Sequence, residues 1–287
     1  MLGRFFSLVY TTWISYQVST SHDLTKHWLI AKRPSYYHKH PVEDVLFNTL
    51  ANDDKQKNIY VYWGVFESGK SWAVANTGLR LQVEEDRLVI LLEGYAFSYI
   101  SSPREWLRFS ILHTLVKYAS EPLSKYFSRP TTIIVDHCDL SLKNGKVIVE
   151  ALRELDIQNA LLVVTSWERA LELRDLYGCK LVEPVGSGRW TADQLGTLLS
   201  LLPHKKSSEE TLEHLMQMAT LAGAPGILTI SIDEDHYHDS GKRTNERRAQ
   251  LMDAEWRNGI SVLNGEKEIT EENAGRFPNK NGSFHWY

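Results

Sequence analysis

The sequence predicts an α/β fold, in which a parallel sheet is sandwiched by helices and a small, mainly helical C-terminal region follows. The first observation is that short apolar runs alternate with stretches of helical composition between residues 58 and 185. Strands separated by helices of this length pair in parallel, and helices cover both faces of the sheet. The second observation is a change after Pro203, where a charged linker leads into another helix.

The predicted strands are runs rich in apolar, β-branched and aromatic residues. They span 58–63, 87–94, 131–139, 159–166 and 180–185. Helices are predicted at 71–82, 101–120, 146–155, 167–177 and 211–223. Two of these helices carry start signals, because Ser102 precedes Pro103 as an N-cap, and Ser207 with Glu210 has the spacing of a capping box.

These elements divide the chain into three expected parts. An N-terminal accessory segment spans 1–45, a core spans 46–205, and a helical or lid region with a polar tail spans 206–287. Residues 5–22 contain no Asp, Glu, Lys or Arg, so residues 1–20 are a candidate targeting or anchoring segment. Ser, Thr and Gln interrupt that run, which favours a packed accessory helix or strand and no membrane partner.

Composition limits the classes of partner. The net charge of −4 gives no overall attraction to nucleic acid, so such binding would need a local patch. The basic stretch 241–248 is the candidate patch, and a solvated helix end is the alternative. Two cysteines indicate no disulfide framework and favour an intracellular, reducing compartment. The acidic, histidine-containing stretch 233–239 is interpreted as a polar loop rather than a metal site.

The strongest motif is "GVFESGKS" at 64–71, which reads G-x-x-x-x-G-K-S between a predicted strand and a predicted helix. In this pattern the glycines allow a tight turn whose N–H groups face a polyphosphate, Lys70 reaches the β and γ phosphates, and the Ser71 hydroxyl ligates Mg²⁺. The candidate nucleotide-binding residues are Gly64, Val65, Phe66, Glu67, Ser68, Gly69, Lys70, Ser71 and Trp72. We call residues 64–71 the phosphate loop.

A second set of candidates lies at the ends of other strands. Asp136 follows four apolar residues and is predicted to hold Mg²⁺ together with Ser71. The base that polarises the attacking water is Asp139, His137 or neither. Thr165 and Ser166 are candidate γ-phosphate sensors, the alternative being hydroxyls that satisfy local backbone. Glu93 ends another strand and could also face the site, and a local structural role is the alternative.

The order of these motifs resembles the P-loop ATPases of the ASCE division, in particular the STAND branch and its AAA-type and archaeal relatives. The resemblance spans roughly residues 40 to 230 and rests on "HPVEDVLFNTL", "GVFESGKS", "IIVDHCD", "LLVVTS" and "GAPGIL". It implies that the segment from His40 borders the base and that Pro225 lies beside the nucleotide, although Gly223 and Pro225 also suit a helix stop. Arg169 or Arg189 is the candidate cation of that family.

We therefore expect a switch protein that binds ATP with Mg²⁺ and hydrolyses it by attack of water on the γ-phosphate, with ATP and ADP as ligands. The expected macromolecular partner is another protein or a second copy of the chain. One alternative is a nucleic-acid motor. The other is a nucleotide-binding scaffold without turnover, which His137 beside Asp136 would suit.

Overall fold

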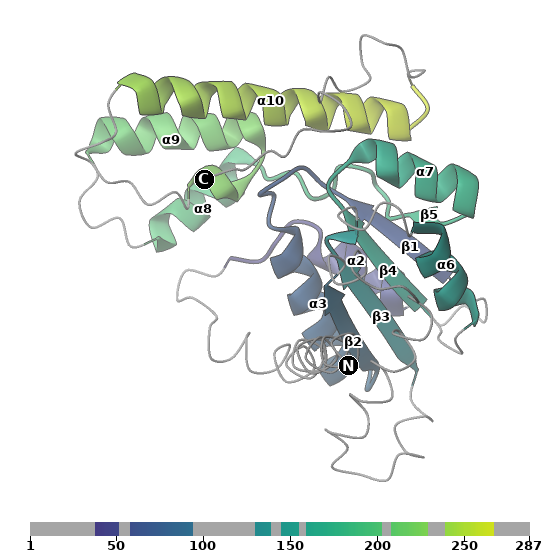
Figure 1. The fold of residues 1–287 in the computed structure, drawn as a ribbon. Coiled ribbons are helices and arrows are strands. Elements are labelled where there is room, and N and C mark those ends of the chain that lie inside the picture. Colours follow the sequence, from purple (N-terminus) through teal and green to yellow (C-terminus); the bar gives the residue numbers. More distant parts are fainter. Residues whose placement is uncertain are drawn as a thin grey trace, which may run out of the picture.

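A parallel sheet forms the centre of the molecule (Figure 1). The computed structural model describes residues 38–51, 58–93, 130–138, 145–154, 159–202, 208–228 and 239–266. In these ranges the strands are β1 (Asn58–Trp63), β2 (Leu88–Glu93), β3 (Thr131–Asp136), β4 (Asn159–Val164) and β5 (Lys180–Leu181). They pair in parallel in the order β2-β3-β4-β1-β5, which confirms the predicted α/β class.

Helices pack on both faces of the sheet and form a separate layer beyond it. The described helices are α2 (Glu43–Ala51), α3 (Lys70–Glu84), α6 (Gly145–Glu154), α7 (Trp167–Tyr177), α8 (Ala192–Leu201), α9 (Glu209–Ala222), the 3-10 turn η3 (Pro225–Ile227) and α10 (Asp239–Leu263). Figure 1 shows α2 and α3 on one face, α6 and α7 on the other, and α8, α9 and α10 stacked beside the sheet.

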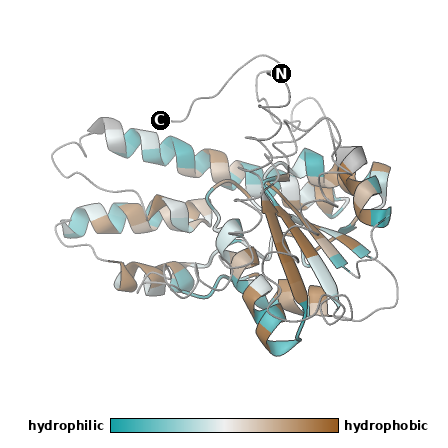
Figure 2. Cartoon of the chain, turned by 60° about the horizontal axis from the view of Figure 1, so that its bottom comes forward, coloured by the Kyte–Doolittle hydropathy of each residue, from teal (hydrophilic) through white to brown (hydrophobic). Residues whose placement is uncertain are grey.

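Alternation along each strand divides the buried side chains into two clusters. One cluster joins the strand residues Tyr62, Ile134 and Val163 to α2 and α3. The other joins residues of opposite parity, such as Val61 and Val135, to α6 and α7 and continues into the C-terminal helices. Figure 2 shows the result: the strands are brown with apolar residues, whereas the C-terminal helices mix brown and teal. The sheet is therefore buried on both faces, as its composition predicts.

The C-terminal helices share a core with the sheet. Trp63, at the end of β1, meets the fully buried Trp256 of α10 edge to face, with ring centroids 5.0 Å apart. Gly259 of α10 lies against the same Trp63 ring, which leaves no room for a side chain. Helix α10 also packs on α9 and α7, and α8 packs on α9. The boundary near residue 205 stays a prediction, and α8 and α9 pack together across it.

Several local predictions can be compared with the described residues. Helix α7 has the predicted bounds, and β5 is shorter than predicted because Pro184, soon after it, has no N–H for a ladder. Ser208, not Ser207, is the N-cap of α9, where its hydroxyl accepts from the Thr211 N–H. The predictions for residues 1–20 and for a helix at 101–120 lie outside the described residues. None of the described helices is both long and apolar enough to cross a membrane.

Glu255 of α10 provides a test of the packing between α10 and α7. Burial and, to a lesser extent, the negative charge of Glu168 on α7 raise the pKa of Glu255 from 4.5 to about 7. A carboxyl with a raised pKa in the folded chain favours folding at low pH, and that contribution is lost as the pH rises from 4.5 through about 7. We expect Glu255→Gln to raise the free energy of unfolding at a pH of about 8 by on the order of 2 kcal/mol, and to lose this advantage toward a pH of about 4.5.

Urea unfolding across this pH range measures the effect. The matched control is Glu213→Gln, which makes the same substitution on the exposed side of α9. A constant difference between Glu255→Gln and the native chain at every pH would contradict the predicted link to Glu255 ionisation.

Candidate functional site

The phosphate loop connects the end of β1 to the start of α3, which is the context that its motif requires. Gly69 has φ of 89° and Glu67 has φ of 58°, so two positions of the loop are left-handed. Successive N–H groups in such a turn form a concave anion site, to which the positive end of the 15-residue α3 adds. The Lys70 ammonium is buried and donates to the Val65 carbonyl at 2.8 Å, across the loop. The Lys70 side chain therefore reaches back across the loop to which it belongs.

Glycine is required at position 69 for two reasons. Its φ of 89° is strained for any residue with a Cβ. A Cβ there would also lie 3.0 Å from Cδ2 of His40, so the imidazole ring packs directly against the loop.

Carbonyl groups of the loop accept hydrogen bonds from three distant segments. The Ser68 carbonyl accepts from Nε2 of His40 at 2.7 Å and from Nε1 of Trp190 at 2.9 Å. The Glu67 carbonyl accepts from the Gly226 N–H at 3.2 Å. The donors come from the segment before α2, the loop before α8 and the turn η3. The loop conformation therefore depends on tertiary contacts.

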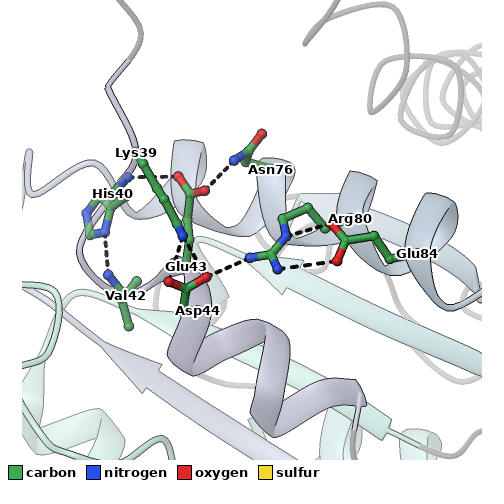
Figure 3. Close-up of polar contacts among 8 residues, drawn as sticks. All are labelled: Lys39, His40, Val42, Glu43, Asp44, Asn76, Arg80 and Glu84. Atoms are coloured by element: carbon green, nitrogen blue, oxygen red, sulfur yellow. Dashed lines mark hydrogen bonds and ion pairs between the residues drawn. The ribbon is translucent and has the colours of Figure 1, made fainter.

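The upstream segment is in turn attached to α3 (Figure 3). Glu43 is fully buried, and its carboxylate accepts from the His40 N–H at 2.9 Å and from the Asn76 amide of α3. Farther along, Asp44 pairs with Lys39 at 2.6 Å and with Arg80 at 2.9 Å. These last pairs are exposed and contribute little to stability. The buried Glu43 is the contact that positions His40.

His40 is a neutral imidazole with one defined tautomer. Its Nδ1 accepts from the Val42 N–H at 3.2 Å, so the proton is on Nε2, which donates to Ser68. Burial, with a further contribution from the charge of Lys70, lowers the pKa of His40 from 6.5 to about 4. The neutral ring, in which Nδ1 accepts from Val42 and Nε2 donates to Ser68, is therefore retained throughout the neutral pH range.

Asp136 lies at the carboxyl end of β3, with only 3% of its surface exposed. One carboxylate oxygen accepts from the His137 N–H at 2.9 Å. Alternation along β3 puts its side chain on the same face as Ile134, which is the face that α3 covers. Burial, and then the negative charge of Asp136, raise the pKa of Tyr62 on β1. Asp136 and the start of α3, where Ser71 lies, thus share one face and one edge of the sheet.

The candidate bases differ in what the structure describes. His137 has φ of 51°, so the chain turns sharply directly after Asp136. Its Nδ1 lies 3.6 Å from the second Asp136 oxygen, and the side chain is 42% exposed. Asp139 lies outside the described residues, as does most of the 233–239 stretch. In the described ranges there is no cluster of three or more His, Cys, Asp or Glu side chains that would form a metal site by itself.

The candidate sensors lie at the end of β4. The Thr165 carbonyl accepts from the Trp63 indole at 2.9 Å, which joins β4 to the start of the phosphate loop. The Ser166 hydroxyl caps α7 by accepting from the Arg169 N–H, and it donates to Glu168 at 2.6 Å. Ser166 therefore satisfies local backbone, which is the alternative to a sensor role that the sequence left open. Glu93 pairs with Asp136 in register, at the same edge of the sheet.

The segment "GAPGIL" ends α9 and lies near the phosphate loop. Gly223 ends α9 with φ of 59°, as a helix stop does. Pro225 follows it and lies near the phosphate loop, because a Cβ added at Gly69 would be 3.7 Å from its Cγ. That Pro225 lies beside the nucleotide stays a prediction.

The cations suggested by the family resemblance have protein partners. Arg189 pairs with Asp253 of α10 at 2.6 Å, and Arg169 pairs with Glu172. A cation that sequence reasoning missed is Arg248 of α10, which pairs with the Glu67 carboxylate of the phosphate loop. The basic stretch 241–248 contains Arg248, but its position beside the loop has no signal in the sequence.

Comparisons with known proteins identify no family and assign no function. No protein-family model matches the chain, and no curated protein matches it. Among solved structures, it is similar to domain III of the Thermotoga maritima replication initiation protein DnaA, with 12% identity over 76% of this chain and 93% of that one, and a TM-score of 0.40.

Two further structures are similar to the same extent. Drosophila ORC bound to DNA has 13% identity over 82% of this chain and 60% of that one, with a TM-score of 0.40. C. elegans PCH-2 has 13% identity over 77% and 67%, with a TM-score of 0.35. Scores this low assign no function. The sheet, the phosphate loop and α3 are nevertheless those of a P-loop nucleotide-binding fold, whereas the narrower STAND assignment gains no support.

The ion pair between Glu67 and Arg248 predicts how the C-terminal helix is held to the loop. Both side chains are 28% exposed, and Oε2 of Glu67 is buried without a partner among the described residues. Arg248→Met should lower the free energy of unfolding by about 1–3 kcal/mol, because it leaves a partly buried carboxylate unpaired. Adding Glu67→Gln should recover part of this loss, which a double-mutant cycle of urea unfolding measures.

The control is Arg257→Met, which removes a 70% exposed guanidinium from Asp253 on the same helix. We expect a change below about 0.5 kcal/mol for this control. Strictly additive effects of the Glu67 and Arg248 substitutions would show that the pair does not join α10 to the loop.

Proposed function

We propose that the chain binds ATP at the phosphate loop and hydrolyses it, with the nucleotide state controlling how the C-terminal region packs on the loop. The observation that carries the proposal is the loop itself, with left-handed Gly69, buried Lys70 and the start of α3 combined at the carboxyl edge of the sheet. A concave set of N–H groups beside a buried cation suits a polyphosphate and has no evident role in stability.

The residues present also suit a magnesium ion. Ser71 and Asp136 offer a hydroxyl and a carboxylate on one face of one sheet edge, and Mg²⁺ prefers such hard oxygen ligands. When bound, the ion would neutralise charge on the phosphate oxygens. Lys70 neutralises charge from the loop side, and the loop N–H groups orient the phosphates. A base polarises the attacking water, and Asp139 and His137 remain the candidates.

The switch part of the proposal rests on contacts between the phosphate loop and the C-terminal region. Gly226 donates to the Glu67 carbonyl, Pro225 packs near Gly69, and Arg248 pairs with Glu67. Phosphates entering the loop add negative charge beside the Glu67 carboxylate and the Arg248 guanidinium. The phosphates then compete with Glu67 for the Arg248 guanidinium, which couples the nucleotide to α10.

The two alternatives differ in support. A nucleic-acid motor needs an available basic surface; in the stretch 241–248 Lys242 pairs with Glu210 at 2.9 Å and Arg248 with Glu67, whereas Arg243 and Arg247 are exposed. A nucleotide-binding scaffold without turnover is favoured by His137, which occupies the position directly after Asp136. A protein partner or a second copy of the chain, and an intracellular location, remain predictions.

Lys70→Ala tests nucleotide binding. The substitution removes the cation of the loop and a hydrogen bond to Val65, and we expect ATP affinity to fall by about 100-fold or more while the fold is retained. Calorimetric titration with ATP and Mg²⁺ measures the affinity, and circular dichroism checks the fold. The matched control is Lys180→Ala, an exposed lysine on β5, which should bind as the native chain does. Equal affinity in Lys70→Ala would remove the loop from the proposal.

Asp136→Asn tests hydrolysis separately from binding. We expect a loss of turnover of about 100-fold or more at saturating ATP, with a much smaller loss of affinity, because the metal acts most strongly on charge that grows in the transition state. Phosphate release at saturating ATP is the measurement. An unchanged rate would exclude Asp136 from the site.

The same assay on Asp139→Asn and His137→Ala distinguishes the candidate bases. A base at His137 also predicts that turnover falls as the pH drops through the imidazole pKa of about 6.5. Absence of turnover in the native chain, with ATP still bound, would favour the scaffold.

A further inference from the structure

A loop that binds an anion through its N–H groups has to direct its carbonyl groups the other way. Each outward carbonyl then needs a donor, because a buried carbonyl without one costs free energy. In the phosphate loop this requirement is most severe at Ser68, a residue with no exposed surface. How the Ser68 carbonyl is satisfied therefore decides which way the adjacent peptide units point.

Two side chains donate to this one oxygen, the His40 imidazole at 2.7 Å and the Trp190 indole at 2.9 Å. Their rings meet edge to face, with centroids 5.1 Å apart and planes at 84°. They come from positions 28 residues before and 122 residues after Ser68. The oxygen is therefore held from two directions by two rigid, planar donors.

Each donor is itself fixed in place. His40 is held by the Val42 N–H on Nδ1 and by its own N–H on the Glu43 carboxylate. The backbone N–H of Trp190 donates to the Gly223 carbonyl, at the end of α9, at 3.0 Å. One donor is thus tied to α2 and the other to the C-terminal helices.

We infer that His40 and Trp190 are positioning residues for polyphosphate binding, which act by holding the Ser68 carbonyl so that the loop N–H groups face the phosphates. The inference rests on the proposed function of the loop. It differs from the role that the family resemblance implies for the segment at His40, which is to border the base. A residue that positions the loop acts on the phosphates whatever base they carry, whereas a residue that contacts the base does not act on inorganic polyphosphate.

This difference defines the experiment. The variants are His40→Leu, which removes one donor with little change of volume, Trp190→Phe, which removes the other donor but also shortens the ring system, and the double variant. His40→Gln is the matched control, because its amide nitrogen can replace Nε2 as the donor. Each protein is titrated with ATP, with GTP and with inorganic tripolyphosphate, all with Mg²⁺.

We expect each single variant to bind all three ligands more weakly by one common factor of about 3- to 10-fold. The double variant should lose more than the product of the single losses, because only then is the buried carbonyl left without either donor. His40→Gln should restore most of the affinity. A loss confined to ATP, with tripolyphosphate binding unchanged, would overturn the inference and show a base contact instead.

Hydrogen exchange of the loop amides in the nucleotide-free proteins gives an independent readout. Exchange at residues 65–70 should be faster in both single variants than in the native chain and in His40→Gln. Unchanged exchange would overturn the inference even if ligand binding fell. If the native chain bound none of the three ligands, the proposed function would fail, whereas the exchange data would still decide whether His40 and Trp190 hold the loop.

Discussion

The hydrogen bonding of the phosphate-loop carbonyls is the constraint on which the site depends. An anion-binding turn has its N–H groups on one side, so its carbonyls need partners on the other. Besides the backbone N–H groups of Ser68 and Ala73, four donors serve these carbonyls: the Lys70 ammonium, the His40 imidazole, the Trp190 indole and the Gly226 N–H. Three of these four donors lie outside the loop, and they come from both sides of it in the sequence. The loop is therefore preorganised by the assembled fold.

The same contacts bring the C-terminal region to the site. The turn η3 and α10 touch the loop through Gly226 and Arg248, while Trp256 packs on Trp63 just before the loop begins. Phosphates bound in the loop would thus lie beside loop residues that contact the C-terminal region directly. This proximity is the physical basis of the proposed switch, because a ligand can shift only those contacts that it affects differently in two states.

Lys70 and Asp136 are buried charges of this site. The buried Lys70 lies beside a histidine that burial keeps neutral, and the buried Asp136 accepts from the backbone of His137. One buried cation and one buried carboxylate at the same sheet edge suit a ligand that carries phosphates and a divalent metal. The base that would polarise water stays a prediction, with Asp139, His137 or neither as the alternatives.

The sequence by itself determined the parallel α/β class, the phosphate loop and the helix that follows it, because apolar alternation and the G-x-x-x-x-G-K-S pattern are local signals. It also placed Asp136 at the end of a buried strand, where all the strands of a parallel sheet present their carboxyl ends. Only the tertiary structure decided that His40 and Trp190 share the Ser68 carbonyl and that Arg248 meets Glu67. The pair formed by Trp190 and Ser68 spans 122 residues, and no periodicity or cap links such distant positions. Their meeting follows from the packing of α2 and of the C-terminal helices around the sheet, which no short stretch of the chain specifies.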